Sequence, residues 1–527
     1  MRIKPKSQPR RRVRPVLWTS TPAAQANPVQ TAIAAAPAAI PAGVPLASLE
    51  SAGPMDGHSG RTGTHPLTRL DENQRLHDYE QRVKDAFARL VPTLKSIAAR
   101  VPDAGFEDWA QAEARRTLGF ELPESRLADA WVAGLDRRAL FAHVTFETVR
   151  AMSDDYFTTD PLDDRGQSDE FSRFLLECGF HAMNVTPCSD GRLAHAIRYV
   201  LRLPMGAVQR RANAGALFDI EEALGRWSTV ELGRFREGVP NTADAPTRYL
   251  KVVIYHYSSR DPEHQGCAAH GSDTRQAAAA GRERLRAFRE AVENSYCCGA
   301  SIEGLLIGID TDTDRLRLHL PEARGDADLD RFVDAGALHR ETARLDPEAA
   351  RALIRERLAN LSGGGLAPAP GMQRLMARLI EHNLSQLDYV RTYHGTHYPD
   401  IGHEERFIGV GMDFAEIHLR NLTYFSFLRT LEEGACNLDV GIKIFKQLNV
   451  DHGLPIPIVI RFEYSGQVPG ARERAIERCE RLAEAIAQRY PDLAEHGLLH
   501  TYWTVRDSQG SGRLEPVGGS LLGGRTA

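Results

Sequence analysis

Two short apolar runs constrain the fold of this chain more than any other feature of its sequence. Residues 252–254 and 305–309 carry no polar side chain on either face. Such strands are typical of parallel sheets that are covered by helices on both sides. A segment with helical periodicity, from about Met372 to Tyr389, follows the second run. From about residue 165 the sequence therefore predicts an α/β architecture, with a first block over residues 165–403.

Residues 66–160 predict helices without strands. Tyr79, Val83 and Phe87 recur at intervals of three and four, and Pro92 is expected to end this helix. No polar constellation suited to chemistry stands out in this segment. We expect an all-helical domain there that serves packing or association.

Residues 404–507 predict a second α/β block with the same order of elements as the first. We expect a strand at 407–412, a helix at about 419–431 and a strand at 456–460. The repeated order suggests that the two blocks are related halves of one fold. Residues 508–527 are rich in glycine and are expected to form a flexible tail.

Residues 1–65 have the composition of a disordered arm. The first 49 residues contain seven Lys or Arg and no Asp or Glu, and much of this stretch is rich in Ala and Pro. Such a segment buries too little apolar surface to offset the entropy of ordering it. A net charge of -5 for the whole chain therefore leaves -12 beyond residue 49. The arm is interpreted as a solubilising tail or as a basic segment that binds an acidic partner, with Trp18 as an aromatic anchor.

The composition excludes two broad classes of protein. No run approaches the about 20 apolar residues of a membrane helix, so no membrane association is expected. Seven cysteines in 527 residues are too few and too scattered for a disulfide scaffold. We expect a cytoplasmic protein whose thiols are available for a metal or for chemistry.

Three residues form the candidate metal site. Cys188 lies between a predicted strand and a predicted helix at 193–203, His256 follows the buried strand that ends at Ile254, and Cys267 lies one loop further on. The carboxyl ends of strands are where α/β sheets place ligands. Two thiolates and one imidazole are the three protein ligands of a catalytic zinc site whose fourth position stays open. Taken singly, each residue is equally well explained as a buried core residue, and the spacing alone does not separate a catalytic from a structural metal.

The segment that begins at Cys188 carries a family resemblance. Its sequence, Cys-Ser-Asp-Gly-Arg at 188–192, resembles the Cys-x-Asp-x-Arg signature of β-type carbonic anhydrases. In those enzymes the ligand His and the second Cys lie three positions apart, whereas His256 and Cys267 lie eleven apart. The longer loop, the helical domain in front and the ligand-poor second block resemble the carboxysomal, ε-class carbonic anhydrases.

This resemblance implies a function and its residues. Cys188, His256 and Cys267 would bind one Zn²⁺ per chain, Asp190 would orient the attacking oxygen, and Arg192 would hold Asp190 away from the open metal position. The enzyme would interconvert CO2 and bicarbonate inside a carboxysome to supply Rubisco. It would be a homodimer, and its arm would bind Rubisco or a shell protein. A nucleic-acid tail is the rival interpretation of the arm, but the resemblance supplies no nucleic-acid step.

Two other functions compete with this enzyme. The first is a non-catalytic, zinc-stabilised scaffold, against which the pair Asp190 and Arg192 argues, because a closed structural site does not need a clamped carboxylate. The second is a zinc deaminase, whose His-x-Glu and Pro-Cys-x-x-Cys pattern is absent.

Other residues of the two blocks are not assigned to the metal site. Asp310, Asp312 and Asp314 do not fit a calcium loop and are interpreted as the polar end of a strand. His394, His397 and His403 are interpreted as residues near the metal, proton shuttles or surface residues. In the second block, matching Val459 to Val253 puts Phe462 in the place of His256, so we expect this half to have lost its metal.

Overall fold

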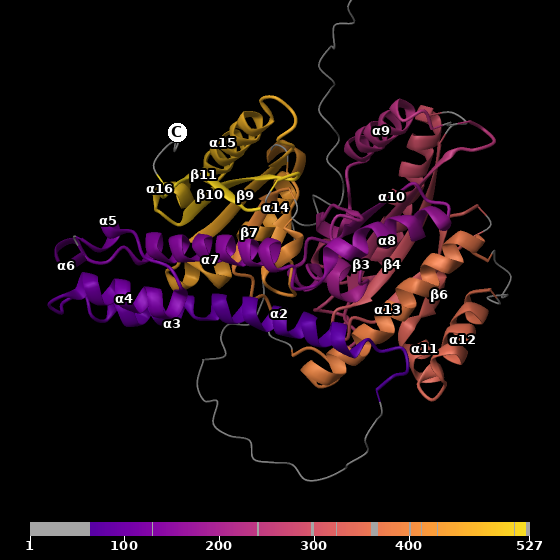
Figure 1. Ribbon diagram of the computed structural model, residues 1–527, viewed down its shortest axis with the longest axis horizontal. Coiled ribbons are helices and arrows are strands. Elements are labelled where there is room, and N and C mark those ends of the chain that lie inside the picture. The colour runs from indigo at the N-terminus through magenta and orange to yellow at the C-terminus, as the bar shows by residue number, and fades with distance from the viewer. Residues whose placement is uncertain are drawn as a thin grey trace, which may run out of the picture. The chain divides into compact units, whose positions relative to one another are not determined.

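Two mixed α/β blocks follow a helical segment in this computed structural model (Figure 1). The structure describes residues 64–522, except 129, 240–241, 297–299, 323, 360–366, 400–401, 413, 429–430 and 511. The predicted arm over residues 1–65 thus lies almost entirely outside the described residues. The predicted fold class, mixed α/β with an N-terminal helical region, is confirmed.

The helical segment consists of α2 to α7. Tyr79, Val83 and Phe87 are buried along one side of α2, as their spacing predicts. Pro92 does not end this helix: α2 stops before it, and Pro92 lies in the first turn of α3, where a helix needs no N–H donor. The bounds are α2 Leu70–Ala88, α3 Leu90–Ala98, α4 Phe106–Leu118, α5 Glu124–Leu127, α6 Ala130–Ala133 and α7 Arg137–Thr159.

The first sheet has the strand order β2-β1-β3-β4-β5-β6. Strands β2, β1, β3 and β4 are parallel, and β5 and β6 continue the sheet antiparallel. Both predicted apolar runs are strands, and residues 252–254 in β3 are fully buried. The bounds are β1 Ala182–Pro187, β2 Gln209–Arg210, β3 Thr247–Tyr257, β4 Ala300–Asp310, β5 Leu316–Pro321 and β6 Ala327–Asp334.

Helices connect and cover these strands. Helix α10 packs on β3 and β4, and α13 packs on α11, α12 and β5. The helix predicted at 372–389 is present in α13 and extends beyond both predicted ends. The bounds are α8 Asp164–Glu177, α9 Ile220–Arg236, α10 Thr274–Tyr296, α11 Ala335–Thr342, α12 Pro347–Ala359 and α13 Pro370–His394.

The second sheet has the order β11-β10-β9-β7-β8. Strands β8, β7, β9 and β10 are parallel, and β11 pairs antiparallel with β10. Helix α15 packs on β9 and β10, and α14 contacts β8 and β9. The bounds are β7 Phe407–Gly411, β8 Thr423–Ser426, α14 Leu431–Leu448, β9 Ile456–Tyr464, α15 Ala471–Arg489, α16 Pro491–Glu495, β10 Leu499–Asp507 and β11 Glu515–Gly519.

Three expectations about local structure were wrong. The helix predicted at 419–431 is replaced by strand β8, because Thr423, Tyr424 and Phe425 favour a buried strand, and α14 begins only at Leu431. The tail predicted over 508–527 contains β11. After Cys188 a 3-10 turn at Gly191–Leu193 and a π-helical turn at Ala196–Val200 replace the expected regular helix.

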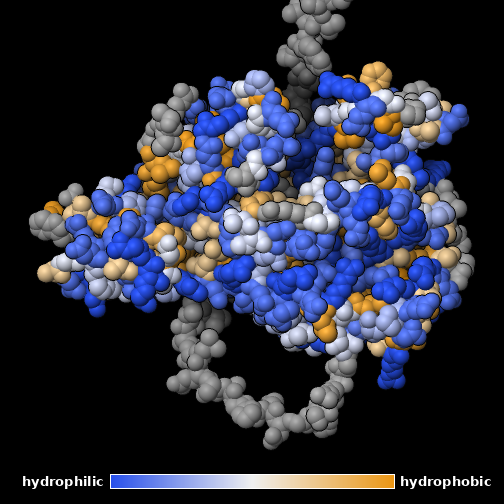
Figure 2. Space-filling model, in the orientation of Figure 1, coloured by the Kyte–Doolittle hydropathy of each residue, from blue (hydrophilic) through white to orange (hydrophobic). Residues whose placement is uncertain are grey.

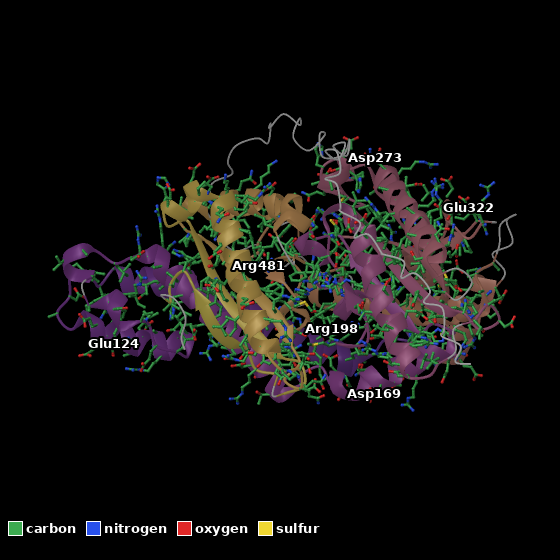
Figure 3. The ribbon with its side chains drawn as sticks, turned by 90° about the horizontal axis from the view of Figure 1, so that it is seen from above. Glu124, Asp169, Arg198, Asp273, Glu322 and Arg481 are labelled. Carbon is green, nitrogen blue, oxygen red and sulfur yellow. The ribbon has the colours of Figure 1, made fainter. Side chains whose placement is uncertain are left out.

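The helical segment joins the two blocks. Helix α2 contacts α13, and α7 contacts β9 and β10, where the Phe146 ring stacks on Tyr502 with 5.0 Å between ring centroids. Arg198 lies in the interior of the structure (Figure 3), pairs with Asp164 and donates to the Leu203 carbonyl at 3.0 Å. The packing role predicted for this segment agrees with these contacts.

The surface is mainly polar on the face shown in Figure 2. Among the described residues, few large apolar side chains are exposed, and Phe235 on α9 is the most exposed of them at 78%. In the described part of the chain, no helix is both long enough and apolar enough to cross a membrane.

Candidate metal centre

Three strand-end and loop residues come together at one edge of the first sheet. Cys188 directly follows β1, His256 is the second-last residue of β3, and Cys267 precedes a short 3-10 turn at Ala268–His270. One ligand atom from each lies within 4.8 Å of the others, and all three residues are buried. The parallel pairing of β1 with β3 brings Cys188 close to His256, because Pro187 pairs with Ile254.

The donor atoms have the properties that a zinc site requires. The two Sγ atoms are 4.0 Å apart, close to the about 3.8 Å between two sulfurs bound tetrahedrally to one zinc. Both cysteines are free thiols. Neither ring nitrogen of the buried His256 has a hydrogen-bond partner among the described residues. A buried imidazole without partners is costly, so these residues fit a metal ligand set better than a plain core.

Asp190 and Arg192 form a closed pair beside the three ligands. Arg192 donates from Nε to Asp190 Oδ1 at 3.0 Å and from Nη2 to Oδ2 at 2.8 Å. Its Nη1 donates to the Gln265 carbonyl at 2.8 Å, which ties the pair to the loop that carries Cys267. Asp190 Oδ2 lies 3.6 Å from His256 Nε2. The carboxylate is therefore held at the edge of the ligand set.

Charge interactions keep this pair ionised. Burial by itself raises the pKa of Asp190, but the charge and hydrogen bonds of Arg192 bring that pKa well below its usual range. At the ligands, the hydrogen bond from Cys267 lowers the pKa of the Cys188 thiol well below normal. A thiolate in this site is the form that binds metal.

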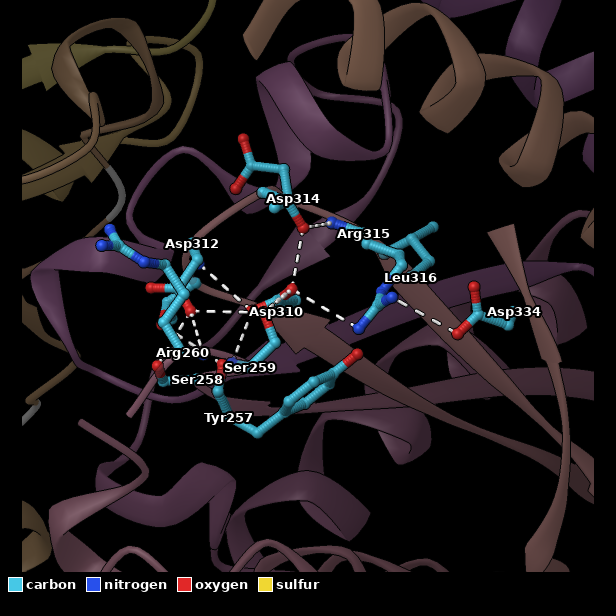
Figure 4. Close-up of polar contacts among 12 residues, drawn as sticks. Tyr257, Ser258, Ser259, Arg260, Asp310, Asp312, Asp314, Arg315, Leu316 and Asp334 are labelled. Atoms are coloured by element: carbon cyan, nitrogen blue, oxygen red, sulfur yellow. Dashed lines mark hydrogen bonds and ion pairs between the residues drawn. The ribbon is translucent and has the colours of Figure 1, made fainter. Parts of the chain in front are cut away.

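The loop between His256 and Cys267 is fixed by two aspartates at the end of β4 (Figure 4). Asp310 accepts hydrogen bonds from the Ser259 backbone at 3.1 Å and from its hydroxyl at 2.7 Å. Asp312 accepts from the Ser258 hydroxyl at 2.8 Å and from the Arg260 backbone at 2.9 Å. These residues lie at a strand end, as predicted, and they anchor the start of the loop.

The second block contributes residues to the site that the sequence did not reveal. Adding a Cβ to Gly191, between the paired residues, would bring it 2.2 Å from Glu405 Oε1. Asn421 donates from its backbone to the Gly191 carbonyl at 3.0 Å and from Nδ2 to the Gly402 carbonyl at 3.0 Å. The nearest signal in the sequence was His403, whose Nδ1 is 3.1 Å from Glu405 Oε1.

The other two histidines of that group lie elsewhere. His397 contacts Thr396 through a hydrogen bond of 3.2 Å, and no contact with the ligands is found among the described residues. His394 packs its ring on Tyr398 with 4.6 Å between centroids. Of the three, His403 has the neighbours that connect it to the metal centre.

A sheet-edge site of two thiols and one imidazole, with an Asp–Arg pair beside it, defines an α/β protein with a group that could hold a metal ion. Models of a known family match nearly all of the described chain: Carboxysome Shell Carbonic Anhydrase, N-terminal at residues 65–157, catalytic domain at 170–403 and C-terminal at 404–521. The chain belongs to the carboxysome shell carbonic anhydrase family, and it is a carbonic anhydrase that carries the catalytic domain of that family.

Curated relatives agree with this membership. The carboxysome shell carbonic anhydrase of Prochlorococcus marinus (strain MIT 9313) is 54% identical over 460 residues, which cover 87% of this chain and 89% of the relative. The protein of the same name from Parasynechococcus marenigrum (strain WH8102) is also 54% identical, over 87% of this chain and 79% of the relative. That from Halothiobacillus neapolitanus is 44% identical, over 87% and 90%.

Proposed function

We propose that this carbonic anhydrase uses one Zn²⁺ per chain, held by Cys188, His256 and Cys267, to interconvert CO2 and bicarbonate inside a carboxysome and to supply CO2 to Rubisco. The observation that carries this proposal is the buried His256 ring, whose nitrogens lack partners among the described residues while two thiols lie within 4.8 Å. Metal analysis of the reduced protein, together with a CO2 hydration assay, tests it. One zinc per chain and turnover that chelation abolishes are expected.

The residues around the ligands have distinct roles in this proposal. When bound, zinc supplies a Lewis acid that lets water ionise near neutral pH. Asp190 Oδ2 accepts a hydrogen bond from the reacting water and orients its lone pair towards CO2. Arg192 holds both Asp190 oxygens, so that the carboxylate stays ionised and does not swing onto the ligand position that water needs.

The alternative of a non-catalytic scaffold lacks support from this geometry. A closed structural zinc site has four protein ligands, and the described residues offer three Cys or His donors in this group. The neighbouring carboxylate is paired with Arg192 and is thereby kept from serving as a fourth ligand. The function as an enzyme is therefore favoured over a scaffold function.

We further propose that the second block is a duplicate half without a metal. The order β2-β1-β3-β4-β5 corresponds to β8-β7-β9-β10-β11, with the last strand antiparallel in both. Tyr257 pairs with Asp310 at the end of the first sheet, and Tyr464 pairs with Asp507 in the second. Each aspartate accepts from the backbone two residues after its tyrosine, Ser259 at 3.1 Å and Gly466 at 3.0 Å.

This correspondence changes the residue that takes the place of the histidine ligand. The backbone of Cys188 donates to the Ile254 carbonyl, and that of Met412 donates to the Arg461 carbonyl. Met412 thus corresponds to Cys188, and Glu463 corresponds to His256. This proposed register differs by one residue from the sequence match, which puts Phe462 in the place of His256. In this block Arg461 is fully buried and pairs with Glu416 and Glu463, so that an ionic cluster occupies these strand ends.

The ionic cluster gives a prediction about stability. Glu416→Leu leaves Arg461 with one of its two carboxylate partners, and the free energy of unfolding is expected to fall by about 3–5 kcal/mol. The double variant Glu416→Leu with Arg461→Met is expected to recover much of this loss. Urea unfolding measures both, and zinc content should remain one per chain. Loss of zinc from the folded single variant would contradict a purely structural role for this ionic cluster.

The N-terminal arm is proposed to bind Rubisco or a shell protein. Deleting residues 1–50 is expected to leave CO2 hydration by the purified enzyme intact and to abolish co-purification with carboxysomes. A full-length variant with Arg10, Arg11 and Arg12 changed to Gln tests whether charge carries the binding, which should weaken as salt rises. Normal encapsulation of the truncated enzyme would place the targeting determinant elsewhere. The proposed homodimer is tested on the same samples by sedimentation.

A further inference from the structure

The pair of His403 and Glu405 lies beside the metal centre and has no role in the mechanism described so far. His403 Nδ1 is 3.1 Å from Glu405 Oε1. The side chain of Glu405 is fully buried, whereas 39% of the His403 side chain is exposed. The two residues therefore connect the interior at the start of the second block with solvent.

Glu405 faces the turn that holds Asp190 and Arg192. Its Oε1 would lie 2.2 Å from a Cβ on Gly191, and its buried Oε2 has no hydrogen-bond partner among the described residues. A buried carboxylate oxygen without a partner is unfavourable unless it meets a proton or water. The charge of Glu405 also contributes to the raised pKa of Arg192. The unpartnered Oε2 thus belongs to a carboxylate whose charge acts on the pair of Asp190 and Arg192.

The position of this pair is fixed by the same residue that supports the turn. Asn421 binds the Gly191 carbonyl through its backbone and the Gly402 carbonyl through its side chain. Next to it, the Arg406 backbone donates to the Leu422 carbonyl at 2.7 Å. The segment 402–406 is therefore bound at both ends to residues 421 and 422, and Asn421 also binds the turn, so that one residue connects the position of Glu405 with that of Gly191.

Hydration of CO2 to bicarbonate releases one proton in each turnover, and that proton must leave a buried site. We propose that Glu405 and His403 carry it to solvent, an inference that rests on the proposed function. Glu405 takes the proton at its free Oε2, and the His403 ring passes it to buffer. Only O–H and N–H bonds form and break, and both groups return to their starting state after each turnover.

Histidine is the side chain whose ordinary pKa lies nearest neutral pH, and the surroundings of His403 favour its protonated form. Burial lowers its pKa, but the hydrogen bond and charge of Glu405, with the charge of Asp190, outweigh this, while Arg192 opposes them. The pKa of His403 is raised overall. Transfer groups work best when their pKa is near the working pH. Glu405→Gln removes the nearest charge and is expected to lower the pKa of His403.

The test separates proton transfer from CO2 chemistry. In ¹⁸O exchange, interconversion of CO2 and bicarbonate and release of labelled water are measured apart, and only release needs the proton path. His403→Ala is expected to slow release about 10- to 100-fold and interconversion far less, with imidazole in the buffer restoring release. Titration of labelled histidines by NMR should show a His403 pKa that falls in Glu405→Gln, a readout independent of turnover.

His264 provides the matched control. It is also paired with a carboxylate, Asp261 at 2.9 Å, and its pKa is raised, but 76% of its side chain is exposed. His264→Ala is expected to leave release unchanged. Equal loss of both steps in His403→Ala, no loss of release, or an equal effect of His264→Ala would each overturn the inference. Failure of the proposed function would differ, because the parent protein would then hold no zinc at Cys188, His256 and Cys267.

Discussion

Cys267→Ser is expected to lose its zinc and to hydrate CO2 at least about 1000-fold more slowly than the parent, equivalent to about 4 kcal/mol of transition-state stabilisation. The physical reason is that Cys267 supplies one of only three donor atoms in the buried group. Metal binding also stabilises a fold that positions its ligands, so the melting temperature should fall as well. Zinc analysis, hydration assays and thermal unfolding measure the three effects.

A matched thiol separates loss of the ligand from loss of a buried sulfur. Cys178 is also buried and free, but it lies at the end of α8, outside the ligand group. Cys178→Ser is expected to keep one zinc per chain and the parent rate. A readout that does not depend on turnover is the thiolate-to-metal absorption of the cobalt(II) protein, which should weaken in Cys267→Ser alone. Full zinc and full activity in Cys267→Ser would exclude this ligand assignment.

Arg192→Ala is the second variant with a large expected effect. It removes the two side-chain donors to Asp190 and the link to the Gln265 carbonyl, while the backbone donor of residue 192 and all three ligands remain. We expect kcat to fall by at least about 100-fold, because the carboxylate loses its orientation and can bind the metal in place of water. Zinc content should stay near one per chain, so the rate loss exceeds what lost metal explains.

Two further variants define what Arg192 contributes. Arg192→Lys keeps the positive charge but not the planar fork, and an intermediate rate is expected. Arg275→Ala removes an exposed ion pair with Asp330 and should change neither rate nor stability measurably. If Arg192→Ala turned over CO2 as fast as Arg275→Ala, the clamp would have no catalytic role.

The sequence predicted those parts of the molecule whose signals are local. The runs at 252–254 and 305–309 form strands because a short run without polar side chains on either face is favourable in the buried interior of a parallel sheet. Residues 419–431 misled because aromatic and apolar residues there satisfy a helical spacing as well as a strand. Burial on both faces, which decided for β8, depends on neighbouring strands that the segment does not itself encode.

In the candidate site, too, the residues with a local signal could be predicted, and those brought in by the fold could not. Asp190 and Arg192 lie within four residues of Cys188, so a short motif contained them. Glu405 and Asn421 reach Gly191 only because the second block folds against the first, and no periodicity or spacing reports such a contact. Residue type alone makes His403 a candidate, and the neighbours that distinguish it from His397 depend on the fold.

The contact between Glu405 and Gly191 has a consequence for how this chain can be divided. Residues 64–403 contain every donor of the metal group. The turn beside this group, however, packs against Glu405 and is hydrogen-bonded to Asn421, and both residues lie beyond that boundary. A fragment cut at residue 403 would present a complete ligand set around an unsupported turn. Insertions, fusions and shuffling of segments at this junction are thus constrained, and the two blocks have to be inherited and engineered together.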